Sequence, residues 1–126
     1  MLQAAIRSQP TPQAAGAARL GAAYVALASL RIRCRSTVDR LANAQTLGPE
    51  VSVDKVMLGS TEHKVNDAMA QLNPYQFLAG DRAHDRDLRA EWLYSRAATV
   101  YGGAVEIQRN IIAEHILKLP SEARHG

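Results

Sequence analysis

The chain has 126 residues, of which 47% are hydrophobic and 5% aromatic, and its net charge at neutral pH is +3. This length predicts one domain with a hydrophobic core of its own, and the apolar fraction excludes a compositionally disordered chain. The small positive charge is not the basic footprint of a nucleic-acid-binding protein, so no nucleic-acid partner is expected.

The start of the chain is rich in arginine, and no acidic residue precedes Asp39. This composition is typical of a mitochondrial transit peptide, but apolar periodicity continues past Arg35 and favours a basic amphipathic helix of the folded protein. The longest apolar stretch, 14–30, is mostly alanine and contains Arg19, so no membrane span is expected. The single cysteine, Cys34, excludes an intrachain disulfide and favours a reducing, cytoplasmic location.

The first predicted elements are a loop and a long helix. Two prolines indicate an N-terminal loop over residues 1–12, and a helix is predicted from Gln13 to Ala44. Its apolar face is expected to hold Leu20, Tyr24, Leu27, Cys34, Val38 and Leu41, with Arg31 filling the one gap. Cys34 on this face is interpreted as a buried structural thiol. Gly48 and Pro49 end the helical pattern.

A second helix is predicted from an N-cap at Ser52 to the Asn73-Pro74 pair. Ser52-x-x-Lys55 has the spacing of a serine nucleophile and its lysine, but a helix cap accounts for Ser52. The charged segment 80–87 is predicted to be a surface loop. A third helix then runs from Leu88 to Thr99, with Asp85 or Asp87 as its cap.

A fourth helix is predicted over 104–118, followed by Pro120 and a tail over 121–126. The pattern therefore indicates an all-α fold, an antiparallel helical bundle over residues 13–120, without strands. Trp92 and Tyr94 are expected to anchor a core or an interface. No metal site is expected, because the histidines lie far apart at 63, 84, 115 and 125.

The fourth helix is preceded by Tyr101-Gly102-Gly103. Glycines at this position allow a left-handed backbone, or they allow a ligand to approach the unpaired N–H groups of the first helical turn. A plain tight turn and a ligand contact both explain the pattern, and Gly103 is predicted to have a positive φ or to pack too closely for a Cβ.

The segment YSRAATVYGGAVEIQRNIIAEHILKLP, residues 94–120, resembles the C-terminal signature of acyl-CoA dehydrogenases. In the family form a tyrosine, any residue and a glycine precede Thr-Ser-Glu-Ile-Gln-Arg-Asn-Ile-Ile-Ala, and residues 106–113 match the last eight positions. The resemblance covers about residues 13–120. It implies the final helical domain of enzymes that also carry an N-terminal helical domain and a middle β domain.

Members of this family remove the α-proton of an acyl-CoA thioester with a carboxylate and pass a β-hydride to FAD. Carried over, the resemblance implies acyl-CoA as substrate and FAD as cofactor. The resemblance assigns contacts with the substrate to Tyr101, Gly102 and Gly103. It gives cofactor contacts to Ala104, Val105 and Glu106.

The sequence departs from the family at several site positions. Gly102 replaces the catalytic glutamate of many members, and Asp39 does not match the base of another branch, so no catalytic residue is assigned. Ala104 and Val105 replace the threonine and serine. Ala70 stands where a glutamine touches FAD, and residues 73 and 74 replace the glycines after it.

The leading interpretation is a partial acyl-CoA dehydrogenase that supplies contacts to FAD and thioester only within a larger homo- or hetero-oligomer. The alternative is a non-catalytic helical module or degenerate subunit that pairs with a full-length dehydrogenase. Whether the chain takes part in catalysis as an enzyme is left open at this point.

Overall fold

The computed structural model describes residues 14–121 of the chain, and in this range it contains helices and no strand. The elements are α2 (Ala14–Ala42), α3 (Val51–Leu72), α4 (Pro74–Ala79), α5 (Ala83–Ser95), the 3₁₀ helix η1 (Arg96–Thr99), α6 (Val105–Ile111) and the π-helical turn η2 (Ile112–Ile116). The predicted all-α fold is confirmed. The predicted loop over 1–12 lies outside the described residues, as do all but the first residue of the predicted tail.

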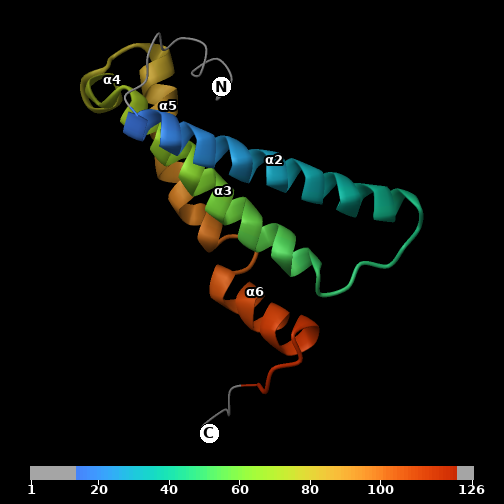
Figure 1. Cartoon of the computed structure of the whole chain (residues 1–126). Helices are drawn as coiled ribbons and strands as arrows, with labels where there is room; N and C mark the ends of the chain where they lie inside the picture. Colours follow the sequence, from blue (N-terminus) through green and yellow to red (C-terminus); the bar gives the residue numbers. More distant parts are fainter. Residues whose placement is uncertain (1–13, 122–126) are drawn as a thin grey trace, which may run out of the picture.

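Helix α3 is the central element of the fold (Figure 1). Helix α2 runs antiparallel along one side of it, and α5, η1 and α6 contact α3 as well. In Figure 1 the outer side of α2 faces away from all other helices. Every segment that approaches the glycine turn before α6 is therefore positioned by its contacts with α3.

The seam between α2 and α3 is built from small and medium-sized apolar side chains. Leu20, Ala23 and Ala68 are buried in it, and Leu27 and Met69 pack against them. Ala23 and Leu30 lie seven positions apart on the buried side of α2, which is the spacing of an antiparallel coiled-coil contact. Because Ala23 retains only 1% of its exposed area, the two backbones approach closely there.

Part of the predicted apolar face of α2 is wrong. Tyr24, Val38 and Leu41 are exposed, and Cys34 is exposed rather than buried. The physical reason is a polar contact in the second half of the seam, where α2 turns Arg33 toward α3 and thereby leaves the neighbouring Cys34 on the outside.

That polar contact is centred on Asp54 of α3. Its carboxylate accepts hydrogen bonds from Nε of Arg33 at 2.5 Å and from Oγ1 of Thr37 at 2.6 Å. Arg33 also donates to the backbone oxygen of Glu50 at 3.0 Å, and Arg40 pairs with the Glu50 carboxylate at 2.6 Å. These half-buried bonds hold α2 against α3 in the part of the seam where few apolar side chains pack.

Two predicted helix starts are wrong, and the short helix α4 was not predicted. Helix α3 begins before Ser52, which is a buried first-turn residue and not the N-cap, because turn bonds from Ser52 and Val53 to Pro49 and Glu50 start the helix earlier. Helix α3 ends at Leu72, as the Asn73-Pro74 pair predicted, and Pro74 then opens α4, because its missing N–H is tolerated at a first helical position. Helix α5 begins at Ala83, so five of the eight residues of the predicted loop over 80–87 are helical.

The end of α5 carries the anchor that the sequence predicted at Trp92. Its indole Nε1 donates to Oδ1 of Asp67 on α3 at 2.8 Å, and the Arg96 guanidinium lies 4.5 Å from its ring. Arg96 donates to the same Asp67 oxygen at 3.0 Å. This cluster fastens α5 and η1 to α3, which in turn sets where the following turn leaves η1.

Leucine at Ala23 is expected to lower the free energy of unfolding by about 1–3 kcal/mol, because the added atoms must force the α2–α3 seam apart. Denaturant melts give the free energy. The matched control is Ala22→Leu, one position along on the exposed side of α2, expected within about 0.5 kcal/mol of the wild type. Equal midpoints for the two variants would contradict this description of the seam.

Within residues 14–121, no helix has the length and apolar character needed to cross a membrane.

Candidate functional site

The candidate site is the turn that links η1 to α6. Both Val100 and Tyr101 donate their N–H groups to the Ala97 carbonyl, at 2.9 and 3.0 Å, and so close η1. Gly102 then has φ +67° and Gly103 has φ +108°, both in the left-handed half of backbone space. The predicted positive φ at Gly103 is confirmed, and it explains the glycine pair, because side-chain-bearing residues rarely adopt these angles.

The Tyr101 ring is held from several directions. It stacks with the Tyr94 ring at a centroid distance of 5.7 Å, and the Lys55 ammonium lies 4.4 Å from its centre. Its hydroxyl donates to Oε2 of Glu62 at 3.3 Å. Desolvation, and then the Glu62 carboxylate, raise the pKa of Tyr101 above its usual value, so the phenol keeps the proton that it donates. Tyr94 is itself largely exposed, so it stacks against the Tyr101 ring and does not belong to the core.

Lys55 connects the turn to α3. Its ammonium donates to the Ala98 carbonyl at 2.8 Å, and Ala98 has no exposed surface. A Cβ on Gly102 would lie 3.8 Å from Cε and 3.9 Å from Nζ of the same lysine. Sequence reasoning missed this role, since the residues involved lie 43 positions apart and the only signal noticed at Lys55 was its spacing from Ser52.

The six residues predicted to contact substrate or cofactor are contiguous, from Tyr101 to Glu106, and the turn brings them together. Their side chains differ in access. Val105 is buried, Ala104 is half-buried and Glu106 is exposed. A contact from Val105 to a cofactor therefore has to come from its backbone.

The resemblance implies that this turn meets one edge of a flavin ring or a thioester. Ala104 is the N-cap of α6 and makes no side-chain hydrogen bond to the first helical turn, so those N–H groups are left uncapped. Gly102 is exposed and presents no Cβ beside them. The fit is limited to this edge, because the side chains of Ala104 and Val105 carry no donor or acceptor.

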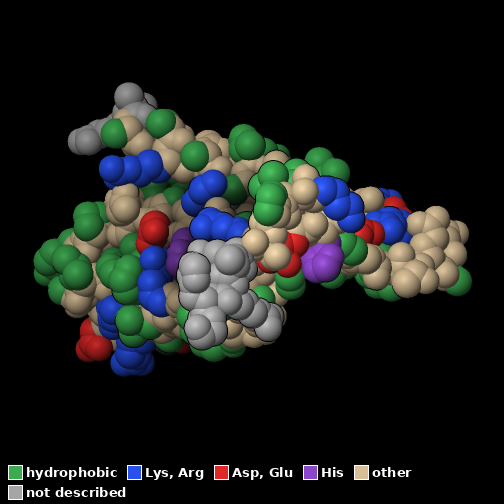
Figure 2. All heavy atoms as spheres, turned by 90° about the horizontal axis from the view of Figure 1, so that it is seen from below, with side chains coloured by type: hydrophobic (Ala, Val, Ile, Leu, Met, Phe, Trp, Pro, Cys, Tyr) green, Lys and Arg blue, Asp and Glu red, His purple; other side chains and the backbone are tan. Residues whose placement is uncertain are grey.

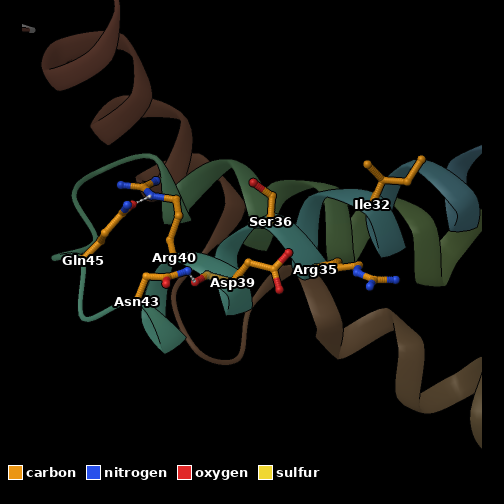
Figure 3. A pocket seen from close by; sticks show the side chains of 7 residues that line it. All are labelled: Ile32, Arg35, Ser36, Asp39, Arg40, Asn43 and Gln45. Carbon is orange, nitrogen blue, oxygen red and sulfur yellow. Dashed lines mark hydrogen bonds between the residues drawn. The ribbon is translucent and has the colours of Figure 1, made fainter.

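Other residues considered for the site lie elsewhere. Ala70 is 15 positions along α3 from Lys55, which places it about 22 Å away along the helix axis. Asp39 lines a shallow hollow of about 390 Å³ on the surface (Figure 3). All side chains of that hollow come from residues 32–45, and none comes from the glycine turn.

Metal-binding groups are not brought together either. Within residues 14–121, no cluster of three or more His, Cys, Asp or Glu side chains could hold a metal ion. His63, for example, contacts the backbone oxygen of Ser95 at 2.8 Å and so joins α3 to the end of α5.

Comparison with known proteins defines the class to which this fold and turn belong. The family described as "Acyl-CoA dehydrogenase, C-terminal domain" matches residues 5–117, which is most of the chain. The chain therefore belongs to the family of acyl-CoA dehydrogenase C-terminal domains.

Among curated proteins, the chain is similar to "Acyl-CoA dehydrogenase IpdE1" of Mycobacterium tuberculosis and to the protein of the same name in Mycolicibacterium smegmatis. Each match is 64% identical over 33 residues, or 26% of this chain. The matched stretch spans only 9% of the first relative and 8% of the second. No solved structure matches the chain.

Proposed function

We propose that the chain supplies C-terminal-domain contacts to FAD and to an acyl-CoA thioester in an α,β-dehydrogenating assembly, and that the 126-residue chain is inactive alone. The observation that carries the proposal is the left-handed Gly102–Gly103 turn in front of an uncapped α6. Gly102 in this turn is exposed and carries no Cβ, which lets a planar ligand approach the backbone there. The family membership makes FAD and acyl-CoA the ligands of choice.

The chemistry of the turn is binding and orientation. FAD, when bound, would supply the acceptor for the β-hydride. Gly102 is exposed and carries no Cβ, so a thioester can approach the backbone of the turn, while the N–H groups of the first turn of α6 donate toward an acceptor atom at the same edge. Gly102 has no carboxylate to remove the α-proton, so in this proposal the base belongs to another part of the assembly.

A non-catalytic assembly module is the alternative function. It is favoured by the loss of hydroxyl groups at Ala104 and Val105 and by the apolar side chains on the outer side of α2. Tyr24, Val25 and Ile32 are 51%, 62% and 73% exposed there. Seen from below, a side of the molecule other than the outer side of α2 also carries hydrophobic side chains beside basic ones (Figure 2). Exposed apolar surface of this kind is typical of proteins that bind another chain.

Co-expression with the products of neighbouring genes is the test of the proposed function. We expect the chain alone to carry no flavin absorbance, and to co-purify with a full-length dehydrogenase in a complex whose size light scattering reports. In the proposed function, Gly103→Ala reduces the flavin content or turnover of that complex by at least fivefold. In the alternative function, the complex forms, and Gly103→Ala changes neither its flavin content nor its turnover. Failure to form any complex would contradict both functions.

A further inference from the structure

We infer that Lys55 is a positioning residue, whose ammonium holds the Tyr101–Gly103 turn in its left-handed form by binding the Ala98 carbonyl and the Tyr101 ring together. The inference rests on the proposed function in one respect: it takes this turn to be the part of the chain that meets flavin and thioester. The placement of Lys55 itself rests only on contacts within the chain.

The first contact satisfies a carbonyl group at the end of η1. The Ala97 carbonyl accepts both N–H groups that close this helix, from Val100 and Tyr101, whereas the Ala98 carbonyl receives the Lys55 ammonium at 2.8 Å. Ala98 is fully buried, so its carbonyl is screened from water and depends on a protein donor. Gly59, one turn along α3 from Lys55, makes room for it: a Cβ there would lie 3.3 Å from the Ala98 oxygen.

The second contact fixes the aromatic ring that leads into the glycines. The Lys55 ammonium lies 4.4 Å from the centre of the Tyr101 ring, within the range of a cation–π interaction. Glu62, two turns along α3, accepts the hydroxyl proton of the same tyrosine at 3.3 Å. Lys55 thus contacts the ring of Tyr101 and Glu62 its hydroxyl, and both residues lie on the same face of α3.

Gly102 and Gly103 need such external control, because glycine has access to many backbone conformations besides the observed one. Tyr101 precedes them, and Val105 follows them in the buried first turn of α6. When Tyr101 is held in place, Gly102 and Gly103 lie between two fixed residues, Tyr101 and Val105, and fewer backbone conformations can connect them. Without the charge at position 55, the Ala98 carbonyl loses its donor and the Tyr101 ring keeps only its contacts with Tyr94 and Glu62, so the turn is less constrained.

The test uses the full chain and three variants. Lys55→Met removes the charge and keeps the length of the side chain, and Lys55→Arg keeps a cation that can donate. Lys64→Met is the matched control, since Lys64 is exposed on the same helix. Amide hydrogen exchange is measured at Val100 and Tyr101, whose N–H groups close η1, and at Ala68 in the seam with α2.

We expect Lys55→Met to speed exchange at Val100 and Tyr101 at least tenfold, with less than a threefold change at Ala68. Lys55→Arg should stay within threefold of the wild type at all three positions, and Lys64→Met should as well. A uniform acceleration that matches the loss of global stability would overturn the inference, because it would show an ordinary structural contact. Unchanged exchange at the turn would overturn it too.

A measurement on the wild type keeps the inference testable if Lys55→Met does not fold. The Lys55 ammonium lies 4.4 Å from the centre of the Tyr101 ring, so NMR should show the adjoining ε-methylene protons shifted upfield by the ring current, and Tyr101→Leu should remove that shift. Resonances at the position of a free lysine would overturn the inference.

Flavin content separates this inference from the proposed function. In a flavin-containing complex, Lys55→Met should lower the bound flavin at least fivefold while the subunits still co-purify, and equal flavin would overturn the positioning role. If the wild-type complex holds no flavin, the proposed function fails, and the exchange rates alone decide whether Lys55 positions the turn.

Discussion

Replacing Gly103 by alanine is expected to lower the free energy of unfolding by about 1–3 kcal/mol, the cost of forcing a residue with a side chain into an unfavourable backbone region. Gly103 has φ +108°, well beyond the small left-handed region open to other residues. A Cβ there would also lie 2.6 Å from Nε2 of Gln108. That amide is the end of a flexible side chain and can rotate away, so the backbone angle accounts for most of the loss.

Gly21→Ala is the matched control for Gly103→Ala. Gly21 lies inside α2 and is exposed, and apart from the neighbouring backbone of its own helix nothing stands within 4 Å of a Cβ built on it. Alanine at this helical position should stabilise the chain by about 0.5–1 kcal/mol, because glycine loses more backbone entropy on folding. The same substitution should thus have opposite signs at the two positions, measured as free energies from denaturant melts. A Gly103→Ala midpoint at or above that of the wild type would contradict the strain assigned to the turn.

The second large effect concerns catalysis: the isolated chain should not oxidise any acyl-CoA with FAD in excess, and Gly102→Glu should not change this. A thioester α-proton needs a carboxylate at the right place before its pKa matters. A side chain at position 102 would begin 3.9 Å from the Lys55 ammonium, so a glutamate there is expected to pair with that cation. Such a pair favours the ionised carboxylate and lowers its pKa, which weakens it as a base.

The assay is the reduction of an electron acceptor with straight-chain, branched and steroid-side-chain thioesters, with and without a co-expressed full-length homologue. Rates of the isolated wild-type chain and of Gly102→Glu should equal the rate without protein. The double variant with Lys55→Met tests whether the lysine alone blocks the new carboxylate, and it should be inactive as well, since in the proposed function the chain supplies only one edge of the ligand site. Turnover by any isolated chain would refute the prediction. Turnover only in the mixture, lost when the partner's carboxylate is removed, would support a contributing subunit.

Local rules accounted for much of the helical organisation. Gly48 and Pro49 interrupt helix formation whatever surrounds them, so the break between α2 and α3 could be predicted. The same holds for the positive φ at Gly103, because a glycine pair directly before a helix indicates that a side chain is not tolerated. The helix starts near Ser52 and Leu88 were less predictable, since neighbouring turn bonds extend α3 by two residues and the Asp85 side chain supports a start of α5 five residues earlier.

The sequence by itself determined the helical class, the place of the glycine turn and the resemblance to acyl-CoA dehydrogenases, because each depends on residues close together in the chain. The tertiary structure alone decided which side of α2 is buried. Asp54 draws Arg33 into the seam, and Cys34 is thereby left in solvent. It also decided what holds the turn. Lys55 reaches Ala98 across 43 positions, and no local pattern encodes a contact that exists only once α3 and η1 have packed together.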